Sequence, residues 1–218
     1  DILADGAMRA ARRIGGRAPE FAIHGSRGTT PVGHDHRRNW AYILDNCVSN
    51  TGTNELHLMP RASALGLAGL SHPFSHTEIA SLVAAVKGVT PLMDSLGVCR
   101  QSTREVPALL VGMVNAATGW DVTWEEMVQV GLRAVNLLRA FYIRHGYKPE
   151  VEAPSVRYGS AIPDGPPQVK GKSIMPMLDD MLNIYYRGMG WERVTGKPLP
   201  ETLRKLDLAH VIPDLWPG

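Results

Sequence analysis

The chain has 218 residues, 44% of them hydrophobic, and a formal net charge of +2 from 23 basic and 21 acidic side chains. This balance excludes a dedicated nucleic-acid binder and a disordered chain, and no apolar run is long enough to span a membrane. The first residues lack the basic and apolar segments of a signal peptide. Cys47 and Cys99 are the only cysteines, which excludes a disulfide scaffold and predicts a reducing, cytoplasmic location.

Apolar residues at helical spacing predict a helix at the start of the sequence. Ile2, Met8 and Ile14 share one face, and Gly15-Gly16 ends the pattern. Because the sequence opens within a helical pattern and without Met, we expect an N-terminal part to precede it.

Residues 16–38 are predicted to form a loop, because glycine and proline interrupt them repeatedly. Seven arginines between Arg9 and Arg38 face only two acids, Glu20 and Asp35. Such a basic segment is either a solvated surface or a surface that faces an anion, such as a phosphate-bearing cofactor or an acidic partner.

Histidines in the same loop offer a possible metal site. His34 and His36 stand two residues apart and could bind a metal on an extended segment, with His24 or His57 as a third ligand. The alternative is that these are loop histidines with local hydrogen bonds, and the sequence does not decide between the two.

Helical periodicity and capping signals predict helices over residues 39–49, 76–86, 102–118, 123–145 and 173–185, and a short helix from about residue 200. Two of them begin with a capping box, Ser102 with Glu105 and Thr123 with Glu126. No convincing series of strands is present. The predicted fold class is mainly α, an irregular multi-helix domain with long Pro/Gly-rich loops such as residues 147–172.

Residues 94–99 are the strongest chemical signal. Cys99 stands three residues before the predicted N-cap Ser102, where unpaired N–H groups favour a thiolate or an anionic cluster. Gly97 allows a ligand to approach the backbone closely, and the Asp94 carboxylate can accept two N–H donors, such as an aminopyrimidinone edge. The alternative is a helix–loop–helix joint with a buried structural cysteine.

Residues 94–99 also resemble the Asp-x-x-Gly-Leu/Val-Cys motif of the tungsten-pterin aldehyde ferredoxin oxidoreductase family. Further segments resemble this family in the same order and cover nearly the whole chain: residues 5–15, 115–121, 131–141, 154–157, 181–186 and 190–198. Order and spacing make the resemblance far more specific than any one motif.

The resemblance implies the C-terminal helical region of such an enzyme. Residues 1–16 would be the closing helix of a preceding helical domain, and residues 17–218 the last helical domain. By position, Asp94 would bind the amino-ring edge of one pterin in a tungsten or molybdenum bis-pterin cofactor. The backbone of Gly97 and Val98 would lie against that cofactor, and Cys99 would be one thiolate ligand of a [4Fe–4S] cluster.

The same resemblance implies partners. A [4Fe–4S] cluster normally needs four thiolates, and the family's other three lie upstream of the matching region, as does its first pterin-binding Asp motif. Cys47 matches none of them. We therefore expect a missing N-terminal portion or a separate subunit with the remaining cysteines, an oligomeric assembly, and a ferredoxin-like electron carrier.

One departure concerns proton transfer. Aldehyde-oxidising members have a histidine near the metal, in a segment that matches residues 51–55 here, and Glu55 replaces it with His57 close by. Both side chains can move protons, so Glu55 and His57 are the catalytic candidates. The resemblance implies oxidation of aldehydes to carboxylic acids or the reverse reaction, while the departure leaves aromatic thioester reduction open.

Two other functions remain open at this stage. The chain could be a non-catalytic helical interaction module that kept the family's fold and lost its chemistry. It could also be a small metal-binding protein that uses His34, His36 and a further ligand.

Overall fold

The computed structural model describes residues 2–31, 33–52, 61–104 and 106–217. Helices and loops make up this part of the chain, and its one extended pairing is an isolated antiparallel bridge between Trp191 and Pro198. The predicted mainly α class is therefore confirmed. Among the described helices, none combines the length and the apolar character that a membrane crossing requires.

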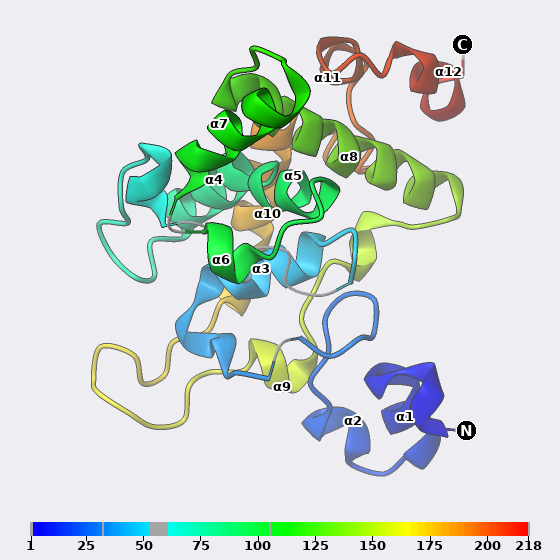
Figure 1. The fold of residues 1–218 in the computed structure, drawn as a ribbon. Coiled ribbons are helices and arrows are strands. Elements are labelled where there is room, and N and C mark those ends of the chain that lie inside the picture. The colour runs from blue at the N-terminus through cyan, green and yellow to red at the C-terminus, as the bar shows by residue number, and fades with distance from the viewer. Residues whose placement is uncertain (1, 32, 53–60, 105, 218) are drawn as a thin grey trace.

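Five helices surround the main hydrophobic core (Figure 1): α3 (Trp40–Val48), α4 (His76–Val86), α5 (Val89–Ser95), α8 (Trp124–Arg144) and α10 (Leu178–Met189). Helix α4 packs along α10, and α5 packs across α8. Small residues make both contacts possible: a Cβ at Gly188 would lie 2.7 Å from that of Ala84, and one at Gly131 would lie 1.8 Å from the Gly88 carbonyl oxygen. The central helices are therefore held at close range by positions that tolerate no side chain.

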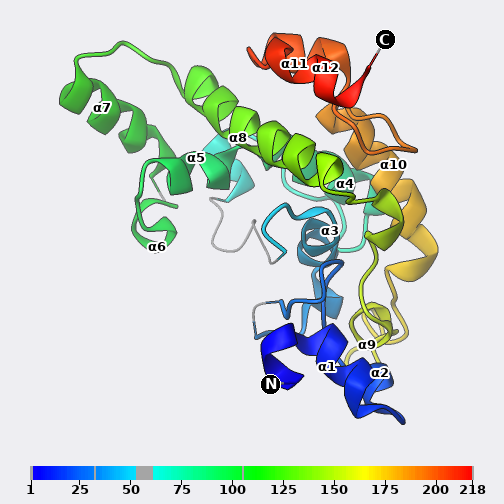
Figure 2. The same cartoon turned by 90° about the vertical axis from the view of Figure 1, so that its right-hand side faces the viewer.

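Shorter elements form the two ends of the molecule (Figures 1 and 2). One end comprises η1 (Ile2–Asp5), α1 (Ala7–Ile14), α2 (Ala18–Phe21), η2 (His36–Arg38) and α9 (Val156–Gly159). Elsewhere lie η3 (Ala62–Leu65), α6 (Arg100–Thr103), α7 (Pro107–Thr118), η4 (Pro149–Val151) and η5 (Met175–Met177). The C-terminal elements α11 (Pro200–Lys205), η6 (Ala209–Val211) and α12 (Ile212–Leu215) form a second apolar cluster with α8.

Most predicted helices are found where the sequence places them, and the capping box at α8 is confirmed. The Thr123 hydroxyl accepts from the Glu126 N–H at 3.2 Å, and the Glu126 carboxylate accepts from the Thr123 N–H at 2.8 Å. The helix predicted over 173–185 is shifted, because Ser173 accepts from the Met175 N–H of η5 and α10 begins only at Leu178.

The second predicted capping box, at Ser102, is wrong. The chain forms the short α6 there, breaks, and starts α7 at Pro107, with Val106 as the N-cap residue. The physical reason is that proline has no N–H to donate within a helix and is suited to its first turn. The Ser102 hydroxyl instead donates to the Cys99 carbonyl at 2.8 Å.

The division at residue 16 stays a prediction. Helix α1 contacts α2, and the Met8 N–H donates to the Gly28 carbonyl at 3.2 Å, so this segment is attached to the loop that follows it.

Two buried ion pairs link distant elements. Lys87, at the end of α4, donates to Asp45 of α3 at 2.8 Å, and both side chains are fully buried. Arg139 of α8 donates to Glu152 at 2.6 Å, and the Tyr186 hydroxyl donates to the same carboxylate at 2.7 Å. Lys87 of the first pair stands two residues before α5, the helix that leads to residues 94–99.

Candidate functional site

Residues 94–99, called the 94–99 loop here, comprise the last two residues of α5 and the tight turn that joins it to α6. The Gly97 N–H donates to the Asp94 carbonyl at 3.1 Å, and the Val98 N–H donates to the Met93 carbonyl at 3.3 Å. Gly97 has φ of +67°, a region that favours glycine over residues with a Cβ. Val98 packs against the main core, while Gly97 lies exposed. Val98 thus anchors the loop to the core, and Gly97 faces the solvent.

Asp94 and Arg100 form an ion pair across this joint. Arg100 Nε lies 2.9 Å from Asp94 Oδ1, and Arg100 Nη2 also donates to Asp94 Oδ2. A carboxylate offers about four acceptor sites, so two such bonds leave capacity for further N–H donors. Asp94 is exposed and can accept them from outside the chain.

Cys99 is the N-cap residue of α6, and its side chain is exposed. The hydroxyls of Ser102 and Thr103 both donate to its carbonyl, at 2.8 and 3.1 Å, which fixes the backbone without engaging the thiol. The interpretation of Cys99 as a buried structural cysteine is therefore wrong. Cys47 is the buried one, and burial raises the pKa of its thiol.

The backbone at Gly97 is open. A Cβ built on Gly97 would meet no atom of the described residues within 4 Å, and Leu96 beside it is 37% exposed. An accessible thiol, an accessible carboxylate and an unobstructed backbone therefore lie within six consecutive residues. This donor set is compatible with one thiolate ligand to a cluster and a carboxylate contact to a pterin edge.

Glu55 and His57 lie outside the described residues, so their roles stay predictions. The chain that leads to them is tightly held. Ser49 Oγ accepts from the N–H groups of Thr51 and Gly52, at 3.1 and 3.0 Å. The Thr29 hydroxyl donates to the Gly52 carbonyl, which ties this segment to the loop before η2.

The described histidines of residues 24–36 have separate partners. His36 is buried and its Nδ1 lies 2.7 Å from the Tyr158 hydroxyl, while His24 Nδ1 lies 2.9 Å from the Gly25 carbonyl oxygen. Asp35 binds Arg37. Across residues 2–31, 33–52, 61–104 and 106–217, no group of three or more His, Cys, Asp or Glu is placed to hold a metal ion. These contacts favour local hydrogen bonding for His24 and His36.

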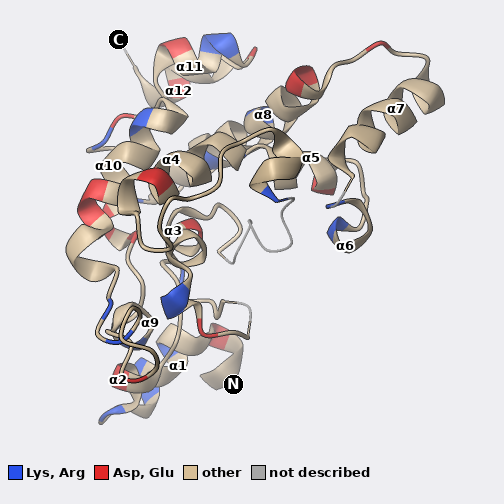
Figure 3. Cartoon of the chain, turned by 90° about the vertical axis from the view of Figure 1, so that its left-hand side faces the viewer, with Lys and Arg blue, Asp and Glu red and all other residues tan. Residues whose placement is uncertain are grey.

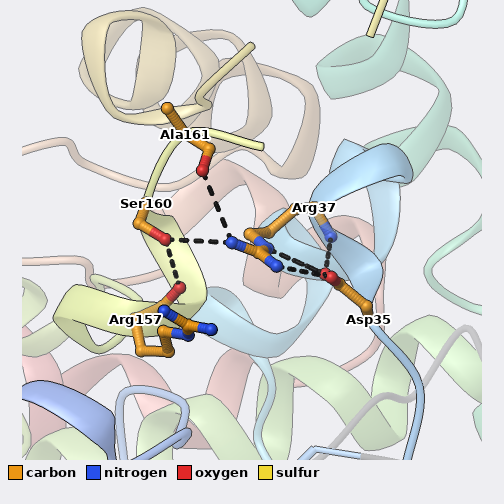
Figure 4. A network of polar contacts seen from close by, with 5 residues as sticks. All are labelled: Asp35, Arg37, Arg157, Ser160 and Ala161. Carbon is orange, nitrogen blue, oxygen red and sulfur yellow. Dashed lines mark hydrogen bonds and ion pairs between the residues drawn. The ribbon is translucent and has the colours of Figure 1, made fainter. Parts of the chain in front are cut away.

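Figure 4 shows a polar network around Arg37 that the sequence does not predict. Arg37 donates from Nη2 to Asp35 at 2.7 Å and from Nη1 to the Ser160 hydroxyl at 3.2 Å. It thereby joins the basic segment to α9, more than a hundred residues further along the chain. The hydrogen bonds from Arg37 lower the pKa of Asp35, although partial burial opposes them. No local pattern in the sequence predicts such a distant pairing.

Most of the chain matches a known protein family. The model of a family described as aldehyde ferredoxin oxidoreductase, domains 2 and 3, matches residues 1–208. The chain therefore belongs to the aldehyde ferredoxin oxidoreductase family, and it corresponds to the C-terminal region of its members, as the resemblance implied.

Individual relatives agree with this assignment. The chain is 29% identical over 218 residues to a tungsten-containing aldehyde ferredoxin oxidoreductase of Pyrococcus abyssi. The aligned region covers 97% of this chain and 34% of that relative. A protein of the same name from Pyrococcus furiosus is 29% identical over 216 residues, 96% of this chain and 34% of that protein. The chain thus spans about a third of the length of these relatives.

A solved structure shares the fold. The active-site complex of benzoyl coenzyme A reductase with 1,5-dienoyl-CoA aligns with a TM-score of 0.70 at 21% identity, over 97% of this chain and 36% of that one. At this identity the likeness concerns the fold alone.

Proposed function

We propose that this chain is the helical part of a tungsten or molybdenum bis-pterin, iron–sulfur oxidoreductase. It would oxidise aldehydes to carboxylic acids, or catalyse the reverse reaction, with ferredoxin-type carriers that accept one electron at a time. The observation that best supports this function is the exposed Cys99 thiol beside the open backbone of Gly97 and the accessible carboxylate of Asp94. Membership of the family supplies the reaction class.

In this proposal each residue has a limited task. Cys99 supplies one thiolate to the cluster, and Asp94 accepts N–H donors of one pterin ring while Arg100 holds its carboxylate in place. The backbone at Gly97 and Val98 lies against the same group. When bound, the metal pterin supplies the two-electron redox chemistry, and the protein contributes placement, exclusion of water and proton transfer.

Proton transfer is assigned to Glu55 or His57. Conversion of an aldehyde and water into a carboxylic acid releases two electrons and two protons, so a base near the substrate is required. Glu and His differ in their usual pKa by about two units, so the two residues would give distinct pH profiles. Substitution of each one separately, followed by measurement of the rate against pH, assigns the base.

Partners follow from the ligand count. The remaining thiolates would come from a preceding portion of the same polypeptide or from a separate subunit, because Cys47 is buried in the core. An oligomeric assembly and a cytoplasmic location complete the proposal.

A Cys99→Ser comparison in the natively assembled species tests the function. Loss of a thiolate ligand should lower the iron content per chain, whereas Cys47→Ala, at the buried cysteine, should leave it unchanged. Unchanged iron in the Cys99→Ser species would contradict the proposal.

The same comparison addresses the non-catalytic interaction module. Exposed apolar side chains on α7 and α8 favour contact with another protein surface: Leu109, Met113, Leu137 and Phe141. Both functions require such a contact, so these side chains do not distinguish them. The module hypothesis alone predicts that Cys99→Ser has no effect on metal content.

A further inference from the structure

A pocket lies between the basic segment and α9. It measures about 680 Å³, within the usual range of small-molecule sites, and residues 23, 30, 31, 33–35, 37, 157 and 158 line it. It shares no lining residue with the 94–99 loop. Figure 3 shows Lys and Arg on several segments around α1, α2 and α9, the end of the molecule in which this pocket lies.

One cation of the pocket is already compensated. Arg37 binds Asp35 through Nε and Nη2, donates to Ser160 and to the Ala161 carbonyl at 3.4 Å, and has 13% of its side chain exposed. Asp164 adds a second negative charge in its vicinity. The Arg37 side chain is therefore held in place in the pocket lining, and its charge is already balanced by Asp35.

Arg157 is the uncompensated cation. It projects from α9 beside this network (Figure 4), its side chain is exposed, and no ion pair joins it to any carboxylate among the described residues. His34 also lines the pocket, and within the described chain its ring contacts only His36, at 6.2 Å between centroids. Among the described residues, the pocket thus contains one guanidinium without a carboxylate partner, that of Arg157, together with the His34 imidazole.

The rest of the lining is apolar or aromatic. Ile23, which is 43% exposed, Pro31 and Tyr158 all line the pocket, and the Tyr158 hydroxyl is hydrogen-bonded to His36. Buried apolar area of this kind selects an organic body over a bare inorganic ion.

We propose that this pocket binds a small organic carboxylate, with its anionic group on Arg157 and its apolar body against Ile23, Pro31 and Tyr158. A planar guanidinium matches a carboxylate through two parallel hydrogen bonds. A singly charged carboxylate also matches the single lining arginine that has no carboxylate partner among the described residues, whereas a doubly charged phosphate would meet the Asp35 carboxylate without a second such arginine in the lining. The site does not depend on the proposed cofactor chemistry.

Benzoate binding to the natively purified species that contains this chain tests the proposal, with titration calorimetry as the measurement. Arg157→Gln should weaken benzoate at least about tenfold, because a charge-assisted hydrogen bond is lost, while Arg157→Lys should retain part of the affinity. The matched control is Arg187→Gln, an exposed arginine on α10 with no ion pair among the described residues, which should leave binding unchanged. Benzamide, a neutral molecule of the same shape, should bind much more weakly than benzoate.

Three results would overturn the proposal: equal benzoate affinity in the Arg157→Gln species, equal affinity for benzamide, or inorganic phosphate that binds as tightly as benzoate through Arg157. The Cys99→Ser species separates this inference from the proposed function. Benzoate binding that depends on Arg157 should persist there even where iron is lost.

Discussion

Asp94 and Arg100 are joined at 2.9 Å across the turn that connects α5 with α6, so both ends of the 94–99 loop are fixed by one ion pair. Both side chains retain some exposure to solvent, and exposed pairs of this kind contribute little stability, about 0–1 kcal/mol. The pair is better explained by positioning: it directs the Asp94 carboxylate and holds the backbone on which Cys99 stands.

This relationship predicts the effect of Asp94→Asn. The amide keeps the shape of the carboxylate but replaces one acceptor oxygen with a donor, which would repel an N–H edge. We expect tungsten or molybdenum and pterin per chain to fall in the native species, with little change in unfolding free energy because Asp94 is exposed. Elemental analysis and pterin fluorescence measure the cofactor content, and chemical unfolding measures the unfolding free energy.

Arg100→Gln is the matched control, since it removes the ion pair and keeps the carboxylate. Cofactor content should fall less than in Asp94→Asn. Equal cofactor content in all three proteins would refute the role of Asp94.

Gly97→Ala should destabilise the folded chain by about 1 kcal/mol, because φ of +67° is unfavourable for a residue with a Cβ. The open space around the position removes any contribution from steric contact. Gly112→Ala is the control, because Gly112 lies exposed within α7 and the substitution should stabilise by about 0.5–1 kcal/mol. Chemical denaturation measures both, and two changes of the same sign would show that the backbone conformation at Gly97 is not the cause.

Asp45→Ala should be strongly destabilising. The change leaves the fully buried Lys87 ammonium without its carboxylate, at a cost of about 3–5 kcal/mol. The double variant Asp45→Leu with Lys87→Met should lose much less, because no charge remains buried without a partner. A double-mutant cycle that adds the single variants Asp45→Leu and Lys87→Met measures the coupling by urea unfolding, and purely additive losses would contradict it.

The tyrosines around Glu152 predict that the free energy of unfolding depends on pH in the alkaline range. Burial, reinforced by the Glu152 carboxylate, raises the pKa of Tyr147 and Tyr186 above the ordinary value of 10.0. Above that pH the unfolded chain loses phenolic protons that the folded chain keeps, so the free energy of unfolding should fall as pH rises.

Tyr186→Phe isolates this effect, although it also removes a hydrogen bond to Glu152. The slope of unfolding free energy against pH above pH 10.0 should be shallower in the variant, by up to about 1.4 kcal/mol per pH unit. Parallel slopes for the two proteins would show that Tyr186 is not responsible.

Local signals predicted much of the fold. The capping box of Thr123 and Glu126 and the apolar stripe behind it define α8, because both depend on neighbours within a turn or two. The N-cap predicted at Ser102 is wrong because Pro107, a few residues later, starts a separate helix.

Long-range pairing escaped prediction. Arg139 lies near the end of α8, where an arginine is usually exposed, but it is 1% exposed and bound to Glu152. Only the packing of α8 against the loop after it brings these residues together. The Arg37–Ser160 contact and the Lys87–Asp45 pair are likewise set by tertiary structure.

The candidate site was half predictable. Order and spacing identified residues 94–99 as the segment of interest; Asp94, Gly97 and Cys99 are exposed there, and their roles stay predictions. The Asp94–Arg100 pair and the shielding of Cys47 depend on how the chain folds around them.

The metal content of the natively and anaerobically purified species that contains this chain tests the proposed oxidoreductase most directly. The proposal predicts about one tungsten or molybdenum and about four irons per chain, with the remaining cluster ligands from a partner segment. An intact, folded native preparation with neither metal nor iron would contradict it and leave a helical interaction module as the better explanation.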